Sequence, residues 1–86
     1  MKLNDTEKNV LLTVKDISQI LDVSTGCVDS WTRDGRLKCF RLGKLKRIEP
    51  TELLRYLKNV GNSEIAMYWF EDNIRRYIKY HKKARR

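Results

Sequence analysis

Basic side chains that suit phosphate binding are concentrated in two stretches of the chain. Residues 33–48 carry seven basic and one acidic side chain, and residues 75–86 carry seven basic side chains and no acidic one, within a net charge of +8. Such blocks favour a polyanion partner, usually nucleic acid and less often an acidic membrane surface, although they also suit a surface that only keeps the protein soluble. The first block comprises Arg33, Arg36, Lys38, Arg41, Lys44, Lys46 and Arg47.

The sequence lacks the groups of residues that catalysis or metal binding requires. His81 is the single histidine, and Cys27 and Cys39 do not have the paired spacing of a zinc site. The chain has no carboxylate pair in a catalytic motif and no glycine-rich phosphate loop. We therefore predict no enzyme activity, metal, cofactor or small-molecule substrate, and two reduced cysteines that fill space in the core.

The length and the apolar runs bound the class of protein. The 86 residues fit one small domain, and the longest apolar run, Ile65–Phe70, is far shorter than a membrane span. The first residues are polar and do not resemble a signal peptide. These features predict a cytoplasmic protein without membrane contact.

Two short helices are predicted before the first basic block. Thr13 and Asp16 match a capping box, and apolar residues then recur at helical spacing to Leu21. Asp22-Val23-Ser24 predicts a tight turn and a new N-cap, followed by a helix that ends at Gly35. On this second helix the expected inward residues are Cys27, Val28 and Trp31, and the expected outward residues are Thr25, Gly26, Asp29, Ser30 and Arg33.

A hairpin and two further helices complete the predicted order. Residues 39–42 and 45–48 read as strands around Gly43-Lys44, a register that sets Arg41 opposite Lys46. Because facing like charges are destabilising, we expect an anion to lie over this pair. Phe40 is expected in the core. Pro50 opens a third helix, and Glu64 opens a fourth that runs to about His81.

The last helix has an apolar stripe wider than one contact face needs. Met67, Phe70, Ile74, Tyr77 and Ile78 form the stripe. The stripe must close over the core, pair with a second copy, or bind another protein. The residues assigned to such an interface are Ile65, Tyr68, Trp69, Phe70 and Tyr77.

These elements predict a mainly α fold with a small β-hairpin, that is, a winged helix-turn-helix with an added C-terminal amphipathic helix. The predicted divisions are a loose segment over 1–10, a DNA-binding domain over 11–60, and a helix with a basic tail over 61–86. The tail beyond Tyr80 is expected to be mobile and to add affinity for polyanions.

Several motifs resemble the excisionase and MerR-type winged helix-turn-helix family. They are Leu12–Ile17, Leu21–Ser24, Val28 with Trp31, Arg33–Leu37, Arg41-Leu42-Gly43 and Arg47-Ile48. The resemblance implies binding of duplex DNA, with the second helix in the major groove and the hairpin on the backbone or minor groove. It implies base contacts from Thr25, Gly26, Asp29 and Ser30, and phosphate contacts from Arg33 and Arg36. The contacts of the hairpin would come from Arg41, Lys44, Lys46 and Arg47, and we assign Lys38 to the same DNA-binding set.

Three positions, which make two departures, differ from the family pattern. Asp22 stands where glycine is usual, and Asp29 and Ser30 stand where aromatic or basic residues are common. Asp29 can accept a hydrogen bond from cytosine but repels phosphate, so this helix either reads bases weakly, relying on backbone contacts and DNA shape, or faces a protein. The resemblance implies an accessory protein of site-specific recombination in a phage or mobile element, or a small transcriptional regulator. The alternative is an adaptor that docks on a replication or DNA-packaging enzyme.

Overall fold

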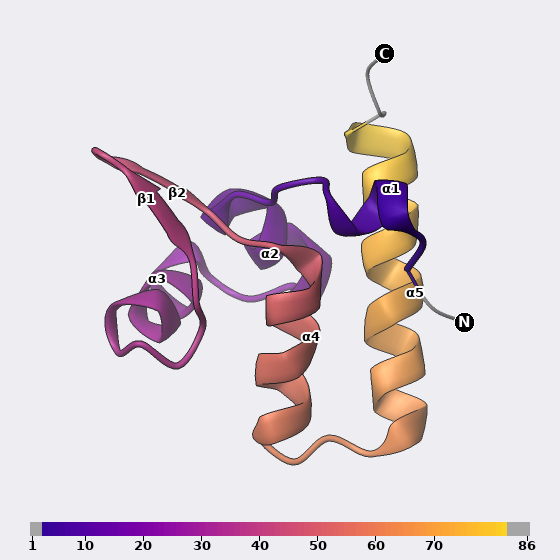
Figure 1. The fold of residues 1–86 in the computed structure, drawn as a ribbon. Helices are drawn as coiled ribbons and strands as arrows, with labels where there is room; N and C mark the ends of the chain where they lie inside the picture. The colour runs from indigo at the N-terminus through magenta and orange to yellow at the C-terminus, as the bar shows by residue number, and fades with distance from the viewer. Residues whose placement is uncertain (1–2, 83–86) are drawn as a thin grey trace.

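Helices dominate the computed structural model, which describes residues 3–82. Within them the chain forms five helices and one two-stranded antiparallel sheet (Figure 1). In chain order these are α1 (Asp5–Lys8), α2 (Val14–Leu21), α3 (Thr25–Arg33), β1 (Phe40–Leu42), β2 (Leu45–Arg47), α4 (Pro50–Asn59) and α5 (Glu64–His81). This is a winged helix-turn-helix with an additional C-terminal helix, as the sequence predicts.

Local capping defines the helix-turn-helix formed by α2 and α3. The Thr13 hydroxyl accepts a hydrogen bond from the Asp16 backbone N–H, and the Asp16 carboxylate accepts one from the Thr13 N–H, each at 2.9 Å. Asp22 ends α2 in the left-handed conformation, with φ 57° and ψ 47°. Ser24 then caps α3 by accepting a hydrogen bond from the Cys27 N–H. The capping expectations for both helices are confirmed.

The hairpin β1–β2, here called the wing, follows α3 after a loop through Gly35. Its register sets Arg41 opposite Lys46, as predicted, and Gly43 in the turn has a positive φ. At the base of the wing, Leu12 and Ile48 form an antiparallel bridge through hydrogen bonds of 2.8 and 2.7 Å. This bridge ties the residue before α2 to the end of β2, while the wing itself projects from the body (Figure 1).

The core lies between the helix-turn-helix and the pair α4–α5. Ile17 of α2, Val28 of α3, Ile48 and Leu53 are buried together with Ile74 of α5. Trp31 of α3 packs against this core, its ring 4.9 Å from that of Tyr56 on α4. Helix α5 lies alongside α4 and also contacts α2, so it completes the domain in cis (Figure 1).

Residues 3–9 of the segment that was expected to be loose contain a short helix and contact α5. A capping box between Asn4 and Glu7 begins helix α1. Leu3 is buried and donates its backbone N–H to Glu71 at 3.1 Å, and Glu7 pairs with Arg75 at 3.1 Å. These contacts with α5 are distant in sequence, which is why local composition did not predict them.

Two residues expected in the core are exposed instead. The buried residues of α3 are Val28 and Thr32, four positions apart, so Cys27 is turned toward solvent. Because Arg41 and Lys46 point toward α3, Phe40 lies on the opposite face of the wing and is 52% exposed. Cys39 is half-buried and packs against the core.

Candidate nucleic-acid interface

The outward face of α3 presents small and polar side chains. Thr25 and Gly26 are exposed in its first turn, and only the Ser24 hydroxyl, at 3.8 Å, approaches a Cβ added to Gly26. Ser30 is half-buried, and Arg33 is exposed in the last turn. A surface of this kind allows close approach of a partner and offers few large side chains for reading bases.

Asp29 is held by two cations of its own chain. Its carboxylate accepts a hydrogen bond from Lys46 and pairs with Arg33 at 3.2 Å, leaving the side chain 37% exposed. The hydrogen bond from Lys46 lowers the pKa of Asp29, and the charges of Lys46, Arg33 and Arg41 add to this effect against partial desolvation. The anion expected over the Arg41–Lys46 pair is therefore an internal carboxylate.

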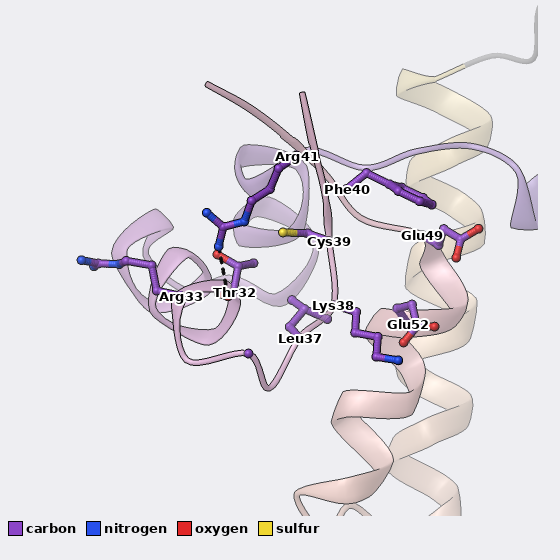
Figure 2. Close-up of a pocket in the computed structure, with 10 residues that line it drawn as sticks. Thr32, Arg33, Leu37, Lys38, Cys39, Phe40, Arg41, Glu49 and Glu52 are labelled. Atoms are coloured by element: carbon purple, nitrogen blue, oxygen red, sulfur yellow. Dashed lines mark hydrogen bonds between the residues drawn. The ribbon is translucent and has the colours of Figure 1, made fainter. Parts of the chain in front are cut away.

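Thr32 is a contact residue that the sequence did not reveal. It is buried, and its hydroxyl accepts a hydrogen bond from Lys46 at 3.1 Å. Its carbonyl accepts a hydrogen bond from Arg41 at 3.4 Å, the dashed line in Figure 2. The sequence could have revealed the position of Thr32, because it lies four residues after Val28 and the two therefore share one face of the helix. Thr32 and Asp29 together are where the wing meets α3.

The remaining basic residues of the first block surround this contact. Lys44 is exposed in the wing turn, and Arg41 is exposed along β1. Arg47 is half-buried and donates to the Lys46 carbonyl at 2.8 Å. Arg36 is exposed at 4.0 Å from Asp34, and Lys38 is exposed in the loop that leads to the wing.

A groove of about 530 Å³ runs between the end of α3, the wing and the start of α4 (Figure 2). Its α3 and wing sides carry basic groups, and its α4 side carries Glu49 and Glu52. The lining residues are Thr32, Arg33, Gly35, Leu37, Lys38, Cys39, Phe40, Arg41, Glu49 and Glu52. Nowhere in the described part of the chain does a group of His, Cys, Asp and Glu side chains form a metal site.

The predicted partner-binding residues of α5 separate into two groups. Ile65, Tyr68 and Trp69 are exposed. Phe70 and Tyr77 instead pack against the core, and the Tyr77 hydroxyl donates to Asp16 at 2.6 Å. The stripe therefore closes in cis, and three of the five predicted interface residues remain exposed.

Comparison with known proteins gives one family-level match. A family model described as a helix-turn-helix domain matches residues 11–60, which is more than half of the chain. No curated protein and no solved structure matches this chain. Within residues 3–82, no helix is both long enough and apolar enough to cross a lipid bilayer.

Proposed function

The chain belongs to the helix-turn-helix domain family, a family of DNA-binding regulatory proteins, and from this premise we propose that it binds duplex DNA as an excisionase-like or MerR-like protein. In this proposal α3 enters the major groove and the wing contacts the backbone or minor groove. The DNA-binding unit is residues 11–60, and residues 61–86 add a helix and a basic tail. The protein acts as an accessory factor in recombination of a phage or mobile element, or as a small regulator of transcription.

One observation carries this proposal: the exposed cations around α3 and the wing lie on one part of the fold. Arg36, Lys38, Arg41 and Lys44 are exposed and come from the α3–wing loop and the wing. Arg33 is exposed on α3 itself, although it is also paired with Asp29. Phosphate contacts of this kind position a protein on DNA without specifying sequence, so we propose a weak reader of bases that relies on backbone contacts and DNA shape.

Salt dependence of binding tests the proposal. If about five phosphates are neutralised, the logarithm of affinity falls with the logarithm of salt concentration at a slope near −4 to −5. Fluorescence anisotropy with random and candidate duplexes at several salt concentrations gives this slope. A slope near zero on every duplex would contradict phosphate-based binding.

A pair of lysine variants localises the contact. Lys44→Ala removes an exposed charge from the wing turn, and we expect the slope to shrink by roughly 0.9. Lys58→Ala removes an exposed charge from the far end of α4 and should leave the slope unchanged. Equal effects of the two variants would show that net charge, and not the wing, binds DNA.

The outer face of α5 favours a second candidate, an adaptor that docks on a replication or packaging enzyme or on a second copy of itself. Ile65 is 82% exposed, and Tyr68 and Trp69 lie three and four residues further along the same helical face. Sedimentation velocity of the wild type and of Trp69→Ala tests the second copy, with Tyr80→Ala as a matched exposed aromatic. A wild type that sediments as a monomer at all concentrations contradicts self-association.

A further inference from the structure

We propose that Asp29 is a positioning residue, which fixes the wing against α3 through Lys46 and thereby keeps Lys46 from serving as a phosphate contact. This inference rests on the proposed DNA-binding function. It replaces the role of base reader that the family resemblance implies for Asp29. It also removes Lys46 from the set of backbone contacts that the sequence predicts.

Apolar packing does little to orient the wing. Phe40 and Leu45 are 52% and 53% exposed, and the core cluster includes none of the described side chains from Phe40 to Arg47. The backbone bridge between Leu12 and Ile48 holds only the base of the wing. The angle between the wing and α3 therefore depends on polar contacts higher up the strands.

Those polar contacts converge on one turn of α3. Lys46 donates to the Asp29 carboxylate and, at 3.1 Å, to the Thr32 hydroxyl. Arg41, its cross-strand neighbour, donates to the Thr32 carbonyl at 3.4 Å. Asp29 and Thr32 are three residues apart on α3, so both strands of the wing are fixed to the same helical turn.

Exposure separates Lys46 from two basic residues that are predicted phosphate contacts, Arg33 and Arg36. Its side chain is 20% exposed, against 68% for Arg33 and 66% for Arg36. The Asp29 carboxylate also offsets the repulsion between Lys46 and Arg41, which face each other across the hairpin. Breaking the pair on DNA would leave this like-charge contact uncompensated within the protein. In the proposed complex the Asp29–Lys46 pair stays formed and fixes the spacing between α3 and the wing.

The first test uses the protein without DNA. Backbone amide hydrogen exchange of residues 40–47 is measured in the wild type, Asp29→Ala, Lys46→Ala and the double variant. Both single variants should speed exchange in the wing to a similar extent, and the double variant should not speed it further. Lys44→Ala is the matched control and should leave exchange unchanged. Unchanged exchange in Asp29→Ala, with the melting temperature preserved, would overturn the proposal.

The second test measures affinity for several duplexes. Asp29→Ala and Lys46→Ala should each weaken binding to every duplex about two- to fivefold, the effect of a partly exposed ion pair. The double variant should resemble either single variant, and Lys46→Arg should keep wild-type affinity because it retains the charge and donors. Tighter binding by Asp29→Ala, multiplicative effects, or loss of preference at one base pair would each overturn the proposal.

The two tests separate this inference from the function on which it rests. A wild type that binds no duplex contradicts the proposed function, whereas the exchange measurement still decides whether Asp29 fixes the wing. Normal DNA binding with additive variants contradicts the inference alone.

Discussion

Tyr77 joins α5 to the capping box of α2 through a single hydroxyl. It donates to the Asp16 carboxylate at 2.6 Å and lies 2.9 Å from the Gln19 side-chain oxygen. Burial, with the hydrogen bond to Asp16 and its charge, raises the pKa of Tyr77 to about 12 from 10.0. Because the folded pKa exceeds the unfolded one, the stabilising contribution is complete below pH 10.0 and disappears as the pH rises through about 12.

Tyr77→Phe should therefore destabilise the fold at neutral pH by about 1 to 2 kcal/mol, since a hydrogen bond to a charged group is lost. The difference in free energy of unfolding between wild type and variant should shrink above pH 10.0. Urea denaturation at several pH values measures it, and Tyr80→Phe, at an exposed position, is the control. A constant difference across this range would show that the hydroxyl contact does not form.

Asp16 gives the opposite pH dependence. Burial acts to raise its pKa, but hydrogen bonds from the Thr13 N–H, Tyr77 and Lys82 hold the pKa below its ordinary value of 3.8. Its contribution to stability is therefore present above pH 3.8 and lost as the pH falls through the lower folded pKa. Asp16→Asn should be less stable than wild type at neutral pH, and acid titration of unfolding should show the gap narrowing below pH 3.8. A gap of equal size in acid would contradict this.

The sequence predicted single residues well where their partners are near in the chain. Thr13 and Asp16, three positions apart, and Arg41 and Lys46, related by a two-residue turn, were both predicted correctly. The Asp29–Lys46 pair was not predicted, because its members are 17 residues apart and lie in different elements, α3 and β2. The DNA-contact assignments themselves stay predictions.

At the scale of elements, the turn between α2 and α3 contains one residue in an unfavourable backbone conformation. Asp22 occupies a left-handed conformation that favours glycine. Asp22→Gly should raise the free energy of unfolding by about 0.5 to 1 kcal/mol. Asp34 ends α3 with a negative φ of −76°, so Asp34→Gly is the matched control and should stabilise nothing. Equal effects of both variants in thermal unfolding would rule out relief of the backbone conformation as the cause.

The order and bounds of the main elements were predictable because caps and breakers are local signals. Pro50, Ser24 and Glu64 mark starts that the structure confirms. The sequence analysis wrongly placed Cys27 on the buried face of α3. Helical spacing shows which residues share a face, but it does not show which face the neighbouring elements cover. Helix α1 was missed although Asn4 and Glu7 form a capping box, because its four residues are too few to show an apolar period and none of them is buried.

At the scale of the whole molecule, α5 belongs to the fold and is not an appendage. Ile74 is fully buried between elements, so Ile74→Ala should cost about 2 to 5 kcal/mol in stability. Ile65 on the same helix is 82% exposed, and Ile65→Ala should change stability by less than about 0.5 kcal/mol. Thermal unfolding of both variants measures these changes in stability. If α5 were only loosely attached, the two variants would lose similar amounts of stability.

One residue of the expected basic tail belongs to the fold. Lys82 pairs with Asp16 at 3.0 Å and is part of the fold, whereas residues 83–86 lie outside the described residues. Deleting residues 83–86 should weaken DNA binding at low salt, because three basic side chains are lost. Anisotropy at low and high salt measures this, and a deletion without effect at low salt would assign the tail no role in binding.

The docking of the N-terminal segment on α5 has a consequence for how the chain is made. Leu3 and Glu7 are synthesised before their partners Glu71 and Arg75, which lie 68 residues further along the chain. The segment around α1 therefore cannot dock until that stretch of the chain has been made. During synthesis Leu3 stays accessible to chaperones, and a ribosome-stalled chain that stops before α5 should leave it unburied.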